Sequence, residues 1–149
     1  LEGKVARVFS FEIKDGVGPK QFWGRWGIFT NDKFGVPIAK PRYTALAFLN
    51  AMTGKRINVA GQGTWVKAFA KDDNGTLKTL IVNYDPYGQH YENVPIKFIN
   101  LKSQNFTYKR LNFLGGERTI EVATNSAEWQ TLESFAPNSA ALIQIIPKQ

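Results

Sequence analysis

The chain has 149 residues, with 19 Lys and Arg against 12 Asp and Glu, which gives a formal net charge of +7. This length fits one domain with part of another, and it is too short for a complete (β/α)₈ barrel of about 250 residues. Because there is no Cys and only one His, disulfide frameworks, His-rich metal clusters and Cys nucleophiles are excluded. No apolar run approaches the ~18 residues of a membrane span, and no signal peptide opens the sequence. The sequence begins at Leu1, and we expect it to be a processed or excised piece.

The positive charge permits binding to nucleic acid or to another acidic polymer. The basic residues, however, are scattered singly, and their densest group is the pair Lys109-Arg110. Because nucleic-acid sites gather cations into a patch or stripe, we interpret the charge as a solvated basic surface and expect no nucleic-acid partner.

The N-terminal region predicts a strand followed by an unusually long loop. Val5–Ile13 is rich in β-branched and aromatic residues and is almost continuously apolar, which is typical of a strand buried on both faces. Asp15-Gly16 ends this strand, and the loop that follows runs to about Lys40. Loops of this length in compact domains usually serve a function or contact a partner.

A helix is predicted to follow the loop. Pro41 fits its first position, where the missing N–H of proline costs nothing, and Gly54 fits its C-terminal cap. An apolar stripe along this helix predicts that it covers a hydrophobic surface, and its members are Leu46, Leu49 and Met52, widened by Phe48.

From Arg56 onward the hydrophobic period changes to two, which is typical of half-buried antiparallel strands. Asn74-Gly75 is the strongest turn signal, because a tight hairpin needs positive φ at both central residues. We therefore expect a mainly β fold, in which a strand–loop–helix unit (1–55) precedes an antiparallel β-sandwich (56–149). The predicted strands are Thr64–Ala70, Thr76–Tyr84, Asn93–Ile99, Asn105–Phe113, Glu117–Ala123, Trp129–Phe135 and Ala140–Ile146.

Three segments of the first region resemble a known enzyme family. Val8–Gly16 (VFSFEIKDG), Trp23–Phe29 (WGRWGIF) and Lys40–Leu46 (KPRYTAL) are similar to the last strand, loop and helix of a glycosidase barrel. The family is the clan-A-type retaining glycosidases, which includes β-xylosidase-like and iduronidase-like enzymes. A C-terminal β-sandwich commonly packs on that barrel, and three further segments resemble it: Gln62–Ala68, Ile81–Asp85 and Pro137–Leu142.

The resemblance implies that this chain supports a catalytic barrel without carrying the catalytic groups. In that clan both catalytic carboxylates lie on the fourth and seventh strands, whereas this chain resembles the barrel only from the eighth. A retaining mechanism needs two carboxylates about 5 Å apart, and no residue here matches either position. We therefore expect the chain alone to be inactive, with no cofactor and no metal.

The resemblance also implies partners and a location. The partners are a carbohydrate and the rest of a barrel, and the location is extracellular or periplasmic. Without the barrel, the strand Val5–Ile13 is an orphan edge, which is then expected to pair with another copy of the chain, to add to the sandwich or to aggregate.

The candidate substrate-binding residues lie in or beside the long loop. Aromatic rings stack on the apolar faces of sugars, so Trp23 and Trp26 fit a substrate subsite, and Arg25 fits hydrogen bonding to hydroxyls or to a uronate. The alternative is that the two rings seal the loop against the barrel rim. Asp15 completes the candidate set. An acid–base pair of Asp15 with Glu12 is disfavoured, because nothing here separates the two pKa values.

Two other functions stay open. Trp65, Tyr84, Tyr87 and Tyr91 favour a freestanding carbohydrate-binding module, since such modules present exposed aromatic rings, although Trp65 on an alternating strand is more typical of a core or a domain interface. Tyr87, His90 and Tyr91 share one polar loop. A purely structural interaction module is the remaining alternative.

Overall fold

The computed structural model describes residues 12–148, and its contacts divide the chain into two compact units. The first unit ends at Ala47 and the second begins at Phe48, whereas the sequence placed a boundary after residue 55. The observed division falls inside a helix, because the C-terminal half of that helix packs on the β-sheet of the second unit. The predicted strand Val5–Ile13 lies outside the described residues except for its last two, which are not in a strand.

The first unit is mostly irregular, as the sequence predicts for a long loop. Its only regular element before the helix, among the residues described, is the 3₁₀ turn η1 (Asp32–Phe34). Two isolated bridges hold the loop together: Phe29 pairs in parallel with Lys14 and antiparallel with Ala39. Further backbone hydrogen bonds tie the loop together, such as that from the Thr30 N–H to the Ile38 carbonyl oxygen at 3.0 Å, and side-chain contacts add to them.

The helix α1 (Pro41–Ala51) begins at the predicted proline. Gly54 follows it with a φ of +95°, and a Cβ there would lie 2.3 Å from the carbonyl oxygen of Asp72. Both observations require glycine at this position. Gly54 lies three residues beyond the end of α1, so the close approach to Asp72 accounts for this glycine, and its role as the helix cap stays a prediction.

The predicted apolar stripe of α1 is wrong in part. Phe48 and Met52 are buried against the sheet, whereas Leu46 and Leu49 are exposed. Phe48 and Met52 are four residues apart and share one face, whereas Leu46 lies about 200° around the helix from Phe48. Of the three stripe residues, Leu46 and Leu49 are therefore free to pack against a partner outside the described chain.

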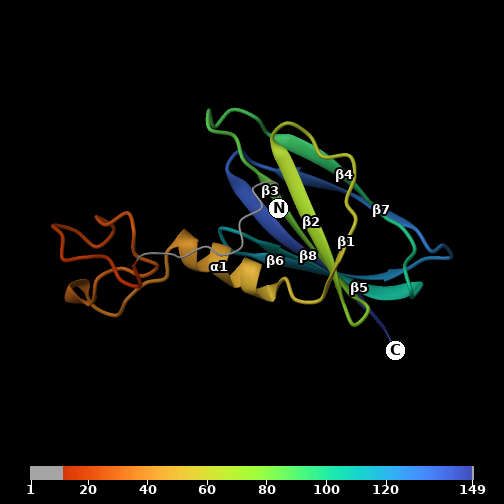
Figure 1. Cartoon of the computed structure of the whole chain (residues 1–149), viewed down its shortest axis with the longest axis horizontal. Coiled ribbons are helices and arrows are strands. Elements are labelled where there is room, and N and C mark those ends of the chain that lie inside the picture. Colours follow the sequence, from red (N-terminus) through yellow and green to blue (C-terminus); the bar gives the residue numbers. More distant parts are fainter. Residues whose placement is uncertain (1–11, 149) are drawn as a thin grey trace. The chain divides into compact units, whose positions relative to one another are not determined.

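The second unit is an antiparallel β-sandwich, as predicted. One sheet has six strands in the order β1-β2-β3-β8-β5-β6, and the other has two, β4 and β7 (Figure 1). Every strand predicted for residues 56–149 is present, and only the short β1 was missed. The strands are β1 (Lys55–Ile57), β2 (Val66–Asp73), β3 (Thr76–Asn83), β4 (Glu92–Phe98), β5 (Asn105–Asn112), β6 (Glu117–Ala123), β7 (Trp129–Phe135) and β8 (Ser139–Pro147).

The hairpin between β2 and β3 has the predicted geometry. Asn74 and Gly75 have φ values of +53° and +96°, as a tight turn with two left-handed residues requires. The Asp72 carboxylate accepts a hydrogen bond from the Gly75 N–H at 2.7 Å. These local contacts fix the register in which Asp73 opposes Thr76.

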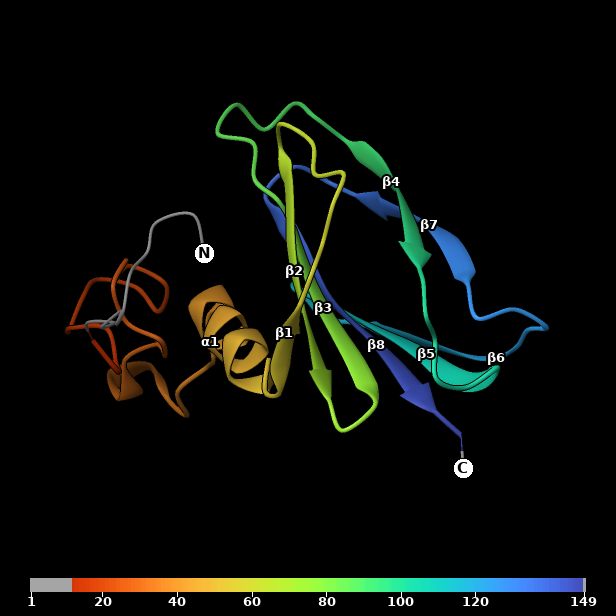
Figure 2. The ribbon, with the colours of Figure 1, turned by 45° about the vertical axis from the view of Figure 1, so that its right-hand side comes forward.

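The central strands β3 and β8 are buried on both faces. Ile81 and Ile143 point into the core between the sheets, which β4 and β7 close from the other side (Figure 2). Their neighbours Leu80 and Leu142 point the opposite way and contact Phe48 of α1. Because successive side chains in a strand alternate between faces, the two central strands carry near-continuous apolar runs.

Two leucines in the sandwich give a matched test of this packing. Leu142 is buried in β8, whereas Leu132 is exposed in β7. We expect Leu142→Ala to lower the free energy of unfolding by about 2–5 kcal/mol, because it removes apolar contacts and leaves a cavity. Leu132→Ala removes the same atoms from a solvated surface and should change it by less than about 0.5 kcal/mol. Urea unfolding followed by circular dichroism measures both, and equal effects would contradict the assigned faces of the sandwich.

Candidate functional site

The carboxylate of Asp15 is the centre around which the N-terminal loop is arranged. Asp15 is only 3% exposed. The Lys40 ammonium donates to both of its oxygens at 2.8 Å, and the Gly27 N–H donates to Oδ1 at 2.8 Å. The same Lys40 ammonium reaches the carbonyl oxygen of Gly24 at 2.7 Å. One ion pair therefore joins the start of the loop, its middle and the residue just before α1.

This environment keeps Asp15 ionised. Burial alone raises the pKa of the carboxyl group, but the hydrogen bonds from Lys40 and from the Gly27 N–H outweigh burial and lower the pKa below its ordinary value. A buried carboxylate held in this way is a structural anchor.

The glycines at 24 and 27 are needed because the chain passes so close to Asp15. A Cβ on Gly24 would lie 2.3 Å from the Asp15 carboxyl carbon, and one on Gly27 would lie 2.3 Å from the Asp15 backbone nitrogen. Either side chain would displace the loop from its anchor. The spacing of these glycines around Arg25 and Trp26 is a signal that the sequence analysis did not interpret.

The loop that Asp15 anchors presents two tryptophans. Trp23 is 53% exposed and Trp26 is 62% exposed, and Arg25 between them is also exposed. The ring of Trp23 lies against Gly18, where a Cβ would be 2.5 Å from it. The Arg42 guanidinium lies 6.0 Å from the centre of the Trp26 ring and donates to the Trp26 carbonyl oxygen. The backbone is thus fixed while both rings keep a free face.

The four predicted site residues therefore lie in or beside one loop, but they differ in burial and in contacts. Asp15 lies beneath the chain and is committed to Lys40 and Gly27, whereas the three other residues are on the surface. Contact of any of them with a sugar stays a prediction. Lys40, which holds the arrangement together, was quoted in the sequence only as part of the Lys-Pro motif before α1.

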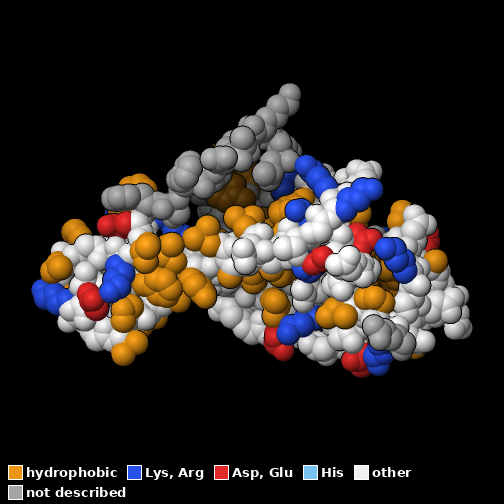
Figure 3. Space-filling view, turned by 60° about the horizontal axis from the view of Figure 1, so that its bottom comes forward, with side chains coloured by type: hydrophobic (Ala, Val, Ile, Leu, Met, Phe, Trp, Pro, Cys, Tyr) orange, Lys and Arg blue, Asp and Glu red, His pale blue; other side chains and the backbone are white. Residues whose placement is uncertain are grey.

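Many apolar side chains of the N-terminal unit are exposed as well, and Figure 3 shows hydrophobic side chains gathered on this part of the chain. Each of the following is more than half exposed: Ile13, Val17, Phe22, Trp23, Trp26 and Val36. Isolated apolar residues are normal on surfaces, but six within 24 consecutive positions (13–36) are not explained by chance exposure.

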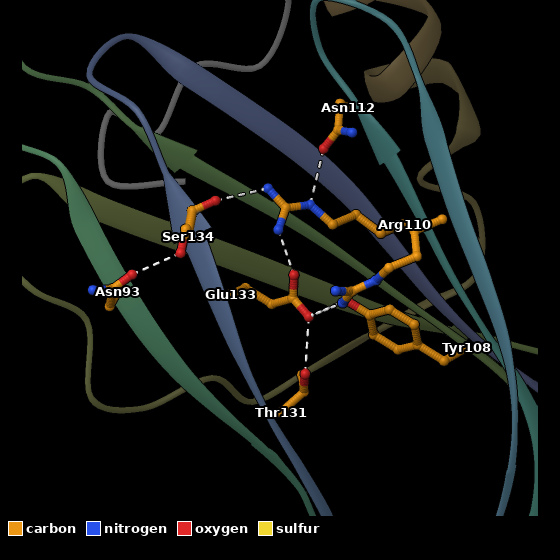
Figure 4. Close-up of polar contacts among 8 residues, drawn as sticks. Asn93, Tyr108, Arg110, Asn112, Thr131, Glu133 and Ser134 are labelled. Atoms are coloured by element: carbon orange, nitrogen blue, oxygen red, sulfur yellow. Dashed lines mark hydrogen bonds and ion pairs between the residues drawn. The ribbon is translucent and has the colours of Figure 1, made fainter.

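A second buried carboxylate lies inside the sandwich. Glu133 of β7 is 1% exposed and accepts hydrogen bonds from the Tyr108 hydroxyl at 2.8 Å and from the Thr131 hydroxyl at 2.9 Å. Arg110 and Arg118 form ion pairs with its two oxygens (Figure 4).

The Glu133 cluster joins the two sheets. Its carboxylate belongs to the two-stranded sheet, whereas Tyr108, Arg110 and Arg118 belong to β5 and β6 of the large sheet. Burial raises the pKa of Glu133, but hydrogen bonds led by that from Tyr108 lower it overall. Burial and the neighbouring carboxylate in turn raise the pKa of Tyr108. Near neutral pH, Glu133 is therefore ionised and Tyr108 is protonated. This arrangement is typical of a pair that holds the structure together.

Glu133 was missed in the sequence, although a signal was present. Trp129, Thr131, Glu133 and Phe135 recur at every second position of β7, so the period of two places a charged residue on the inward face. A charge at such a position requires a buried partner.

Within residues 12–148, no group of three or more His, Asp or Glu is placed to hold a metal ion. Among the described helices, none is long and apolar enough to cross a membrane.

The chain shares its fold with glycoside hydrolases of known structure. The GH39 enzyme from Xanthomonas axonopodis pv. citri is 12% identical with a TM-score of 0.65, and the match covers 87% of this chain and 34% of that chain. The GH51 α-L-arabinofuranosidase from Thermotoga petrophila RKU-1 is 16% identical with a TM-score of 0.50, and the match covers 80% of this chain and 31% of that one. This chain therefore spans about a third of either enzyme. No family model and no curated protein matches the sequence.

The Asp15 anchor can be tested with trypsin, since Arg25 offers a cleavage site in the exposed part of the loop. We expect Asp15→Asn to speed cleavage after Arg25 by about tenfold, because losing a buried ion pair loosens the loop locally. The control is Asp32→Asn, which removes an exposed ion pair with Lys14 and should leave the rate within about twofold. Equal rates in both variants would show that Asp15 does not anchor the loop.

Glu133→Gln tests the cluster between the sheets. We expect a loss of about 3 kcal/mol in unfolding free energy at pH 7, because the largely buried Arg110 charge loses its carboxylate partner. Since the pKa of Glu133 is lowered on folding, its contribution is fully present above the ordinary Glu pKa of about 4.3 and is lost as the pH falls through the folded-state pKa. The difference between wild type and variant should therefore shrink in acid.

Glu121→Gln is the matched control for this experiment. Glu121 pairs with Lys148 and Thr107 on the surface, so its loss should cost less than about 1 kcal/mol. A Glu133→Gln effect as small as that of the control, or one that grows in acid, would contradict the role assigned to the cluster.

Proposed function

We propose that this chain is the C-terminal region of a glycoside hydrolase and that it supports a catalytic (β/α)₈ barrel. The observation that carries this proposal is the exposed apolar surface of the N-terminal unit, above all Ile13, Val17 and Val36. Fully burying a large apolar side chain stabilises a protein by about 1.5–3 kcal/mol, so leaving several of them in water is costly. Such a surface is typical of one that packs against a partner.

The barrel is the partner that the remaining observations favour. The fold likeness to the two glycosidases leaves about two thirds of each enzyme unmatched by this chain. Helix α1 follows the long loop in the order expected for the last helix of a barrel. Its side chains Leu46 and Leu49 are exposed. A barrel packed on these residues would cover them.

Within this proposal, Trp23, Arg25 and Trp26 line a sugar subsite at the rim of the barrel. The Asp15–Lys40 pair holds their backbone, and a rigid support of this kind lowers the entropic cost of binding. The exposed rings offer stacking faces, and the Arg25 guanidinium offers several N–H donors to hydroxyls or to a carboxylate. The chain itself supplies no catalytic carboxylate pair in this proposal.

Side-chain footprinting tests the docking surface. We would read the coding frame upstream of Leu1, express the longer polypeptide, and compare hydroxyl-radical labelling of Ile13, Val17 and Val36 in both proteins. We expect strong protection in the longer polypeptide, because the barrel covers these side chains. Leu114 and Leu132 are exposed on the sandwich and serve as controls that should label equally in both. Equal labelling of all five residues, or an upstream sequence without alternating strand and helix patterns, would contradict the proposal.

The proposed subsite is tested by substitution in the same longer polypeptide. We expect Trp23→Ala and Trp26→Ala each to raise KM for an oligosaccharide substrate about tenfold, which corresponds to about 1.4 kcal/mol, with little change in melting temperature. Leu114→Ala is the control. An unchanged KM with a lower melting temperature would show that the two rings only pack against the barrel rim.

A further inference from the structure

The connection between β3 and β4 carries a group of aromatic side chains that the fold does not use. Residues 84–91 read Tyr-Asp-Pro-Tyr-Gly-Gln-His-Tyr, and we call this segment the tyrosine loop. Its three tyrosines, Tyr84, Tyr87 and Tyr91, are 65%, 71% and 77% exposed. None of them belongs to either hydrophobic cluster of the described sandwich. Large aromatic rings that add nothing to a core are typical of binding surfaces.

The tyrosine loop is held in one conformation by the buried carboxylate of Asp85. Its oxygens accept hydrogen bonds from the backbone N–H groups of Tyr87 at 2.8 Å, Gln89 at 2.5 Å and His90 at 2.7 Å. The imidazole Nδ1 of His90 lies 2.9 Å from the same carboxylate. Burial raises the pKa of Asp85, but these backbone hydrogen bonds outweigh it and hold the pKa well below its ordinary value. The anchor is therefore ionised at neutral pH.

The sandwich fixes the loop from below as well. The Asn83 side-chain amide at the end of β3 donates to the His90 carbonyl at 2.8 Å and to the Ala136 carbonyl at 3.1 Å. It also reaches the Phe135 carbonyl at 3.3 Å, so the loop is tied to the turn between β7 and β8. Asn83 is completely buried, and its Oδ1 has no partner among the described residues.

Trp65 contacts two rings of the loop, those of His90 and Tyr87. Its indole stacks on the imidazole of His90, with centroids 4.6 Å apart and an interplanar angle of 22°. It meets the Tyr87 ring edge to face at 6.1 Å and 89°. The sequence analysis favoured a core or interface position for Trp65, whereas the structure places it half-buried beneath this loop. A ring held in position before binding loses less entropy on contact with a ligand.

The chemistry of the loop fits a neutral ligand. Its only carboxylate is Asp85, which is buried and engaged, and it contains no Lys or Arg. Nucleic acids and acidic polysaccharides require cations at the contact, and the loop itself offers none. A neutral sugar presents an apolar C–H face, which suits an aromatic ring, and hydroxyls, which suit the Tyr hydroxyls and the exposed Gln89 amide.

We propose that the tyrosine loop, supported by Trp65, is a binding site for a neutral oligosaccharide or polysaccharide. Tyr84, Tyr87 and Tyr91 contact the sugar, and Asp85, Asn83 and Trp65 position them. This site belongs to the sandwich alone, so it does not depend on the proposed barrel. It is separate from Trp23 and Trp26 in the sequence and in its structural unit.

The test is binding by the full chain to defined polymers in affinity gel electrophoresis and calorimetry. The probes are arabinoxylan, mixed-linkage β-glucan and galactomannan as neutral polymers, polygalacturonate as an acidic one, and a proline-rich peptide, which also binds aromatic surfaces. We expect binding to at least one neutral polymer, and we expect Tyr87→Ala and Tyr91→Ala each to weaken it roughly three- to tenfold. Salt should have little effect on this binding.

Two sets of controls make the outcome decisive. Leu114→Ala and Leu132→Ala remove exposed apolar side chains elsewhere on the sandwich and should leave binding unchanged. Trp23→Ala and Trp26→Ala should also leave it unchanged, and a loss in these variants would move the sugar site to the N-terminal unit. Binding only to polygalacturonate or to the peptide, equal binding by the tyrosine variants, or no binding to any neutral polymer would overturn the proposal.

Discussion

The two-stranded sheet of β4 and β7 has no backbone pairing to the rest of the sandwich, so side chains alone must hold it over the large sheet. The shared apolar core, which includes Phe98 of β4 and Phe135 of β7, is supplemented by two further kinds of contact. Aromatic packing joins Trp129 of β7 to Phe106 and Tyr108 of β5, and the Glu133 carboxylate binds the Tyr108 hydroxyl and two arginines. The aromatic contacts tolerate small shifts of β7, whereas the ion pairs and hydrogen bonds of Glu133 form only when β7 lies in one position. The core between the sheets, and the loops at the ends of those strands, follow from that placement.

Buried carboxylates also organise two irregular segments of the described chain, the N-terminal loop and the tyrosine loop. Asp15, Asp85 and Glu133 are almost completely buried carboxylates with lowered pKa values, and each accepts hydrogen bonds from several donors. The donors to Asp15 and Glu133 include distant residues, whereas those to Asp85 belong to its own loop. Because an unpaired buried carboxylate is very costly, each one requires its surroundings to adopt a single arrangement. In the N-terminal loop and in the tyrosine loop, the side chains left outward are aromatic. Both proposed binding surfaces thus lie on segments that a buried carboxylate fixes.

The sequence predicted the strands of the sandwich well because they depend on local signals. The period of two, the Asn74-Gly75 turn and the recurring turn residues place each strand end to within three residues, and most ends to within one. The helix was found in the same way, from Pro41 and Gly54. Its buried face was only partly predicted, because an apolar stripe does not say which side of it meets the sheet, and Leu46 and Leu49 stay exposed.

The sequence by itself determined the mainly β class, the antiparallel strands and the loop that carries Trp23, Arg25 and Trp26, since composition, period and turn residues act over a few neighbouring positions. Only the tertiary structure decided which side chains meet across long separations. The sequence indicated Asp15 only as the end of a strand and as a candidate substrate-binding residue, whereas the structure places Lys40, 25 positions later, against it. Glu133 reaches Arg110 across 23 positions, and no local pattern reports such a pair. Buried charges are satisfied by whatever the fold brings near them, so their partners are fixed only when the sheets have packed.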